Sequence, residues 1–323
     1  MRPLDALKEK IKSALPELDC VIGWQEGFDP LHATPLFMRT PEDVDRLIWG
    51  PLNVHNTATY LTGFRGRKVG VVVKGCDSRS IVQLLQEKLL KREELVIFGL
   101  PCAGVVDMAK IAAHVDDLDR VSAVDASGSA LKVTTPTGET SIAWDDVWAD
   151  KCVTCQYHNA IISDHFEGDP LPPSIGGPDS ADPAAEELAK LEAMSPKDLM
   201  AYWAENMKRC IRCYACRNAC PMCVCRDHCI AQTRDPHWQS QDDSVREKLM
   251  FQMIHASHLA GRCTECGECQ RACPMDIPIL ALRRKTNRAI KDIFDYQAGV
   301  DPEAAAPLST FKVEEDNINE RGW

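Results

Sequence analysis

The stretch "KVGVVVKGCDSRSIVQLLQEKLLKREELVIFGLPC", residues 68–102, decides the expected fold. It opens with the β-branched run "KVGVVVKG" (68–75), which is typical of a buried strand. The segment "CDSRSIVQLLQEKLL" (76–90) follows with apolar residues at helical spacing, and "EELVIFGLPC" (93–102) is a second apolar strand. A strand, a helix and a strand in this order predict a βαβ unit with parallel strands. We therefore expect an α/β N-terminal domain.

The neighbouring segments extend this domain. "TPEDVDRLIW" (40–49) predicts a helix that begins with Thr40 as its N-cap. "AGVVDMAKIAAHV" (103–115) predicts another helix. "ALKVTTPTGETSIAW" (130–144) predicts a β-hairpin that turns at Pro136 and Gly138.

Composition limits the class of protein. The chain contains 16 cysteines among 323 residues and has a net charge of −11. Its charged N-terminus has no apolar signal core, and no apolar run reaches the ~18 residues of a membrane span. We therefore expect a reducing cytoplasm, where clustered cysteines indicate metal binding. The negative charge argues against nucleic acid as a partner.

Two cysteine runs carry the clearest chemical signal. "CIRCYACRNACP" (210–221) and "CTECGECQRACP" (263–274) both match the spacing C-x2-C-x2-C-x3-C-P of bacterial ferredoxins. In two-cluster ferredoxins the fourth cysteine of each run ligates the other cluster. The spacing thus predicts two 4Fe–4S clusters, the first with Cys210, Cys213, Cys216 and Cys273, and the second with Cys263, Cys266, Cys269 and Cys220. The alternative is zinc, which uses separated C-x2-C pairs and has no need of the third cysteine.

The region around these runs is expected to be helical. The Pro/Gly-rich stretch "EGDPLPPSIGGPDSADP" (167–183) separates it from the α/β part. Ser195 and Ser244 predict helix starts, and one face of the second helix is expected to carry Val245, Leu249, Met253, Ala256 and Ala260. We expect an α/β domain at 1–166, a linker at 167–190, a C-terminal α-helical ferredoxin-type domain with two clusters at 191–296, and an extended, loose tail at 297–323.

A third site would combine cysteines from several segments. Cys76 and Cys102 each follow one of the two predicted parallel strands, so both thiols are expected at the carboxyl edge of the sheet, where α/β proteins bind ligands. Cys152 and Cys155 follow in "DKCVTCQ". These four cysteines could hold one more cluster. Alternatively, the first two are inert buried thiols and the second two a zinc-knuckle half or a redox pair.

The motifs "GVVVKGCDSRSI", "VIFGLPCAG" and "DKCVTCQ" resemble the coenzyme F-420 hydrogenase/dehydrogenase β-subunit family. The resemblance is strongest to members that are fused to a ferredoxin domain and occur with heterodisulfide-reductase-type or formate-dehydrogenase complexes. It implies a 4Fe–4S cluster at Cys76, Cys102, Cys152 and Cys155. It also implies FAD, and partners that include a metalloenzyme subunit and a soluble electron carrier.

The chain departs from this family where the flavin is expected to bind. Flavin-binding members have a Gly-Gly turn near the N-terminus, whereas this chain has "IWGPLNVHNTATYL" (48–61) with Gly50 alone. Asn53, Asn56 and Thr57 could contact a flavin or could cap a helix. The presence of FAD is thus left open.

Three further cysteines, Cys223, Cys225 and Cys229, have no assigned cluster. We interpret them as spare thiols beside the ferredoxin sites, because the local spacing offers no fourth ligand. A fourth cluster, with Cys20 or a thiol of the α/β domain, is the alternative. His228, His255 and His258 are interpreted as helix-surface or hydrogen-bonded histidines rather than ligands.

The sequence supports three hypotheses about function. The first is an iron–sulfur electron-transfer subunit of a cytoplasmic oxidoreductase complex, with heterodisulfide-reductase-like, hydrogenase or formate dehydrogenase partners. The second is a flavin-containing β subunit that itself reduces or oxidises a deazaflavin or nicotinamide carrier. The third is a zinc-stabilised interaction module.

Overall fold

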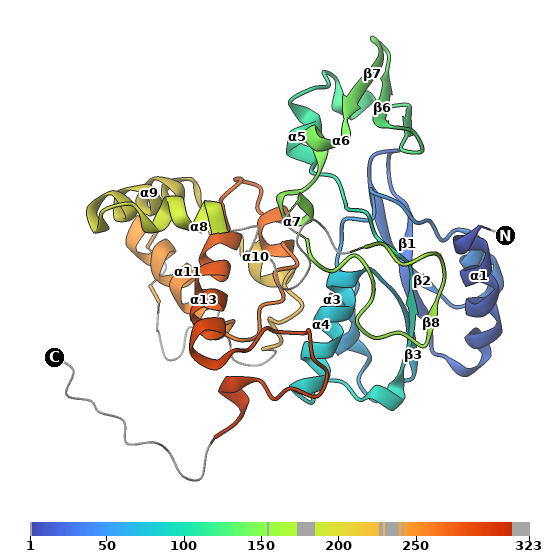
Figure 1. The fold of residues 1–323 in the computed structure, drawn as a ribbon. Helices are drawn as coiled ribbons and strands as arrows, with labels where there is room; N and C mark the ends of the chain where they lie inside the picture. The colour runs from blue at the N-terminus through green and yellow to red at the C-terminus, as the bar shows by residue number, and fades with distance from the viewer. Residues whose placement is uncertain are drawn as a thin grey trace.

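The computed structural model describes residues 2–153, 155–172, 185–225, 229, 239–240 and 242–311. The N-terminal part is built on a five-stranded sheet with the order β2-β1-β3-β4-β8 (Figure 1). β1 pairs with β2 in antiparallel fashion, and the other neighbours are parallel. The strands are β1 (Val21–Glu26), β2 (Ala33–Met38), β3 (Val69–Val73), β4 (Leu95–Gly99) and β8 (His165–Phe166).

Helices cover both faces of this sheet, since its central strands are apolar on both sides. Val71 and Val73 of β3 pack with α3 (Ala58–Leu61) and α4 (Gly75–Gln86), whereas Val72 packs with α1 (Pro3–Ala14) and α2 (Pro41–Asp45). β3, α4 and β4 form the expected parallel βαβ unit. Thr40 caps α2 as predicted, since its side chain accepts a hydrogen bond from the Asp43 amide. The mixed α/β character predicted from the sequence is therefore confirmed.

A small second sheet lies apart from the first. Its strands are β5 (Ala123–Asp125), β6 (Ala130–Thr135) and β7 (Gly138–Ala143), and β6 and β7 form the predicted hairpin. It packs with α5 (Met108–Ala112) and α6 (Trp144–Val147) around a core of its own. α7 (Asp150–Val153) then leads back to the main sheet. In Figure 1 this unit projects from the top of the molecule.

The C-terminal part is helical. It contains α8 (Ala185–Glu192), α9 (Pro196–Arg209), α10 (Ala215–Asn218), α11 (Val245–His258), α12 (Glu268–Arg271) and α13 (Ile279–Phe294). Ser195 and Ser244 cap α9 and α11 as predicted. Single 3-10 turns lie at Leu15–Glu17, Thr62–Phe64, Arg92–Glu94, Leu118–Arg120 and Pro307–Ser309. Within the described residues, no helix has the length and apolar character needed to cross a membrane.

The apolar face predicted for α11 is only partly buried, with Ala256 inside. Met253 is 56% exposed, whereas Lys248, Gln252 and His255 are buried. The cause is local: this side of α11 faces the cysteine loops instead of an apolar core, and Gln252 Nε2 lies 3.7 Å from the sulfur of Cys216. Polar residues are therefore buried where apolar periodicity predicts none.

The two halves share one hydrophobic core. Met222, Leu259 and Cys263 of the helical part pack in the same cluster as the valines of β3. The described part of the tail also packs onto the first half, contrary to the expectation of a loose tail: Ala298 and Ala306 are buried, and Arg79 donates a hydrogen bond of 2.8 Å to the Ala298 carbonyl. Residues 312–323 of the predicted tail and 173–184 of the predicted linker lie outside the described residues.

Candidate metal centres

The two ferredoxin-like runs fold into loops of the same shape. In the first, Arg212 and Tyr214 have positive φ, and in the second Glu265 and Gly267 occupy the equivalent positions with positive φ. A single short helix follows each loop, α10 after the first and α12 after the second. Alternation of right- and left-handed residues turns successive backbone amides toward one centre, which suits an anionic group.

The fold brings the fourth cysteine of each run to the other run. Cys273 lines one small cavity with Cys210, Cys213 and Cys216. Cys220 lies close enough to the second loop to act on its thiols: burial, followed by the charge of Cys220, raises the pKa of Cys266 to about 12. Burial also raises the pKa of Cys269 to about 12, with Cys220 again contributing. The two groups have the composition that the ferredoxin spacing predicts, and the ligation itself remains a prediction.

The raised pKa values bear on what these thiols can bind. A buried thiol keeps its proton at neutral pH unless a cation takes the proton's place. Two nearby cations, Lys151 beside Cys266 and Arg283 beside Cys269, offset the raised pKa values only in part. A metal centre that ligates the thiolates would supply the rest of the positive charge, so the donor set fits a cluster.

The four cysteines of the proposed third site line a single cavity of about 360 Å³. Cys76 is the second residue of α4, directly after β3, and Cys102 follows β4. Cys152 lies in α7, and its sulfur accepts a hydrogen bond of 3.2 Å from the Val105 amide. The Cys155 sulfur accepts one of 3.4 Å from the Tyr157 amide. Such N–H···S bonds stabilise cysteinate ligands of iron–sulfur clusters, so the site fits one.

Close backbone contact holds this site together. A Cβ atom at Gly75 would lie 1.9 Å from the carbonyl oxygen of Tyr157, so a side chain here would push the loop of Cys155 away from α4. The Cys102 amide donates a hydrogen bond of 2.9 Å to the His158 carbonyl, and this bond attaches the same loop to the end of β4. The glycine is therefore needed for the four thiols to meet.

Two buried lysines border the third site, and the sequence analysis did not identify either. Lys74 is 2% exposed, and its Nζ lies 2.9 Å from Asp77 and 4.0 Å above the Trp24 ring. Lys151 donates a hydrogen bond of 2.7 Å to the carbonyl of Cys266 and lies 3.5 Å from Glu268. In the sequence, each lysine lies within two residues of a candidate ligand cysteine, in "KGC" and "DKC", and this position is the signal that could have identified them.

Lys151 remains protonated although it is buried. Burial lowers its pKa, but the carboxylate of Glu268 and the nearby cysteines outweigh this effect, and the net pKa is raised. Its ammonium group thus supplies a fixed positive charge between the third site and the second ferredoxin loop. Thr264 of that loop also lies 3.0 Å from Ser80 of α4, oxygen to oxygen, so the third site lies where the two halves meet.

The three residues considered for flavin binding make contacts within the fold. Asn53 donates to the Ile48 carbonyl, and Thr57 donates to the Val72 carbonyl. Asn56 accepts a hydrogen bond from the Ala58 amide at the start of α3 and donates to Ser80. All three are at most 2% exposed. Only the Asn56 contact lies at a helix start; Thr57 is the N-cap residue of α3 but its side chain bonds to β3 instead, and Asn53 bonds to a loop carbonyl.

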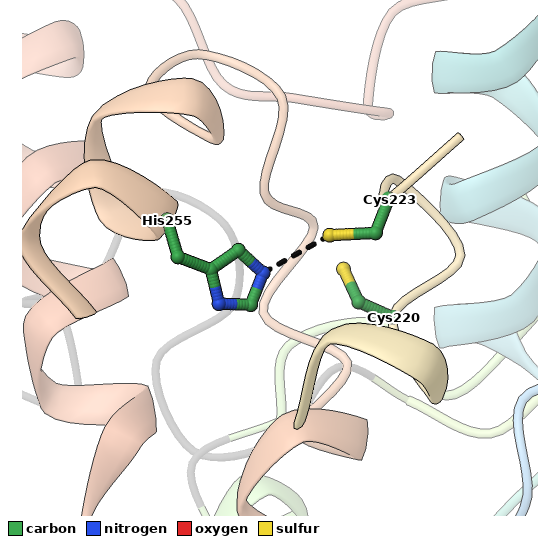
Figure 2. A group of neighbouring side chains, drawn as sticks. All are labelled: Cys220, Cys223 and His255. Carbon is green, nitrogen blue, oxygen red and sulfur yellow. Dashed lines mark hydrogen bonds between the residues drawn. The ribbon is translucent and has the colours of Figure 1, made fainter. Parts of the chain in front are cut away.

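The three unassigned cysteines also lie together. Cys223, Cys225 and Cys229 line a separate cavity of about 280 Å³ with His255. Figure 2 shows the His255 ring pointing at Cys223, with 3.0 Å between Nε2 and the sulfur, and Cys220 beside it. Cys220, Cys223 and His255 each offer one ligand atom, and these three atoms lie within 4.8 Å of one another. Cys20 is fully buried in the core that β3 forms with α3 and α4, and His228 lies outside the described residues.

Comparisons with known proteins show what this chain is similar to. The family model of the 4Fe-4S dicluster domain matches residues 206–277. The F420-dependent formate dehydrogenase 1 subunit beta of Methanococcus maripaludis is 25% identical over 90% of this chain and 89% of its own length. The F420-dependent formate dehydrogenase subunit beta of Methanocaldococcus jannaschii is 36% identical over 106 residues, which are 31% of this chain and a quarter (25%) of that protein.

Among solved structures, a chain of the F420-reducing [NiFe] hydrogenase complex from Methanosarcina barkeri aligns with a TM-score of 0.37 and 19% identity, over 47% of this chain and 59% of that one. The resemblance noted in the sequence is confirmed by the sequence relatives. The chain is thus similar to F420-dependent formate dehydrogenase beta subunits, and its residues 206–277 match the family model of the 4Fe-4S dicluster domain.

Proposed function

We propose that this chain is the iron–sulfur subunit of an F420-dependent formate dehydrogenase or hydrogenase-type complex and relays single electrons through several 4Fe–4S clusters. The dicluster domain and a beta-subunit relative aligned over 90% of the chain support this proposal. A complex of the heterodisulfide-reductase type is consistent with the same features. We place the complex in the cytoplasm, with a soluble carrier as a further partner.

The proposed ligands form three sets. They are Cys210, Cys213, Cys216 and Cys273 for the first cluster, Cys263, Cys266, Cys269 and Cys220 for the second, and Cys76, Cys102, Cys152 and Cys155 for the third. A 4Fe–4S cluster gives up or accepts one electron at a time. The protein would hold the clusters, exclude water from them and adjust their potentials with nearby charges.

One observation carries the proposal: Lys151 connects the third set to the second. It precedes Cys152 in the chain, lines the same cavity as the four cysteines, and donates its hydrogen bond to the Cys266 carbonyl. Two cysteine sets that share a buried side chain are neighbours, and a relay requires neighbouring centres. Zinc sites do not transfer electrons, so they would not need to be neighbours.

The first experiment is a count of iron and acid-labile sulfide per chain after anoxic purification. The three proposed sets require at least about twelve irons, at four per cluster. Cys213→Ala, Cys266→Ala and Cys102→Ala should each remove a different cluster signal in electron paramagnetic resonance (EPR) spectra. Cys20→Ala is the control, because Cys20 lies in the core of the sheet. Stoichiometric zinc in place of iron would reject the proposal in favour of an interaction module.

A second candidate function is a flavin-containing subunit that itself exchanges a hydride with a deazaflavin or nicotinamide carrier. The cavity of the third site supports it, because it continues past the four cysteines to Tyr157, Arg288 and Lys291, where an anionic carrier would find positive charge. Bound FAD in the purified chain, together with reduction of the carrier by the chain alone, would favour this candidate. Iron without flavin and without such turnover would favour the electron relay.

A further inference from the structure

Three cysteines that the proposed relay does not use line a cavity of their own. Cys223, Cys225 and Cys229 surround about 280 Å³, and the rest of the wall is mainly apolar, with Met222, Phe251 and Leu259. Cys225 is exposed, whereas Cys223 and Cys229 are partly buried. A pocket with three thiols on an apolar wall is the kind of environment in which iron–sulfur clusters are held.

Two of the three sulfurs lie within hydrogen-bond distance of nitrogen donors. Arg217 Nε donates to the sulfur of Cys229 over 3.1 Å. His255 Nε2 lies 3.0 Å from the sulfur of Cys223, and Arg283 Nη2 lies 2.6 Å from the other ring nitrogen, Nδ1.

This geometry fixes the role of His255. A guanidinium group can only donate, so Nδ1 accepts from Arg283, and in the neutral ring Nε2 carries the hydrogen. His255 therefore donates an N–H to Cys223. It is a positioning residue, because a nitrogen that carries a hydrogen does not ligate a metal.

We propose that Cys223, Cys225 and Cys229 bind an additional iron–sulfur cluster through their three thiolates, with hydrogen bonds from His255 to Cys223 and from Arg217 to Cys229. Donated hydrogen bonds favour the thiolate form that iron requires. The guanidinium group of Arg217 on the same wall would balance part of the negative charge of a cluster with three thiolates, whereas Arg262 is already paired with Glu87. The inference rests on the proposed function only in that this chain assembles iron–sulfur clusters.

A single zinc ion fits the site less well. Structural zinc takes four ligands at about 2.0–2.3 Å. The three cysteines supply only three, and His255 Nε2 is engaged as a hydrogen donor while Arg283 occupies Nδ1. A cavity of about 280 Å³ is also far larger than one ion needs.

The test compares metal content in the wild-type full chain and in Cys225→Ser. The substitution is at an exposed cysteine, so the fold should be unaffected. We expect about fifteen to sixteen irons in the wild type and about twelve in the variant, since a cluster held by three cysteines contains three or four irons. The EPR signals of the two dicluster-domain centres should be unchanged in the variant, which shows that loss of iron is not loss of folding.

A second variant tests the role assigned to His255. His255→Gln should retain the iron but shift the midpoint potential of the additional cluster to more negative values, because an N–H···S bond is lost or weakened. His114→Gln, at an exposed histidine that does not line this cavity, is the control. Equal iron in the wild type and Cys225→Ser, or one zinc per chain that Cys225→Ser removes, would overturn the proposal. If the relay proposal itself fails, the EPR signals assigned to Cys213 and Cys266 would already be absent in the wild-type chain.

Discussion

Lys151 carries a buried positive charge between two groups of cysteines, and its effect should be electrostatic. At about 8 Å and an effective dielectric constant of about 20, a unit charge contributes about 2 kcal/mol, or on the order of 90 mV for one electron. We expect Lys151→Met to keep the full iron content and to make the potentials of the neighbouring clusters more negative by this amount. Redox titration followed by EPR measures it. Lys190→Met, at an exposed lysine of α8, is the control, and unchanged potentials in both variants would contradict the assigned role.

His55 makes stability depend on pH. Burial, followed by the charge of Arg271, lowers its pKa from 6.5 to about 4. The unfolded chain therefore binds a proton near pH 6.5 that the folded chain binds only near pH 4. Between these values the folded state is disfavoured as the pH falls, so we expect the free energy of unfolding to drop by about 2 kcal/mol from pH 7 to 5 through this residue.

The measurement is anoxic urea denaturation at both pH values. His55→Gln should show a smaller drop than the wild type, because the uncharged amide cannot take up the proton. His258→Gln, an exposed histidine of α11, should behave as the wild type does. An identical pH dependence in all three chains would contradict the role of His55.

At the scale of elements, the second ferredoxin loop depends on Gly267. Its φ is +71°, and a Cβ atom would lie 2.6 Å from Cδ of Lys151. We expect Gly267→Ala to lower the free energy of unfolding by about 1–2 kcal/mol from backbone strain alone, and to displace Lys151. Gly63→Ala, with nothing within 4 Å of the added atom, is the matched control. Thermal unfolding of the two variants checks the difference.

The first ferredoxin loop adopts the same left-handed conformation without a glycine. Tyr214 occupies the equivalent left-handed position, and its ring packs at 5.1 Å against Phe251. An aromatic contact thus offsets a strain that the second loop avoids with glycine. Both loops keep their shape despite this difference in sequence.

The elements also show which predictions the sequence could support. Local patterns suffice for the βαβ unit, the hairpin and the caps at Thr40, Ser195 and Ser244, because each depends on residues near in sequence. The hairpin of β1 and β2 was missed, since the sequence analysis assigned no strand to residues 21–38. The apolar face predicted for α11 is buried only in part, because Gln252 and His255 are buried against partners distant in the chain.

The same reasoning applies to the sites. The spacing of the two ferredoxin-like runs predicted that Cys273 lies with the first run and Cys220 near the second, and the fold has both there, while their ligation stays a prediction. It could not supply Lys151, Arg217 or Arg283, because a charged residue near a cysteine is common and only the tertiary fold shows which one is buried beside it. His255 was interpreted as an ordinary histidine for the same reason.

At the scale of the whole molecule, the C-terminal segment closes the third site. Tyr296, Gln297 and Ala298 line its cavity, and Tyr296 donates hydrogen bonds to α4 residues Gln83 and Gln86. We expect a chain that ends at Asp295 to lose the signal assigned to Cys102 or to lose it faster in air, and to keep both dicluster-domain signals. A chain that ends at residue 311 is the control. Equal air sensitivity of the two truncated chains would contradict this role.

The core shared by the two halves has a consequence for the timing of electron flow. Tunnelling rates fall steeply with distance. A domain that moves on a hinge can therefore start or stop electron transfer by changing the distance between its redox centre and the next one. Here Met222, Leu259 and Cys263 are packed among the same valines that form the sheet, which leaves the two halves of the described chain no freedom to swing apart. The spacing between centres would then be set once, when the chain folds. Electron transfer would then have to be regulated where partner proteins bind and dissociate, at either end of the series of clusters.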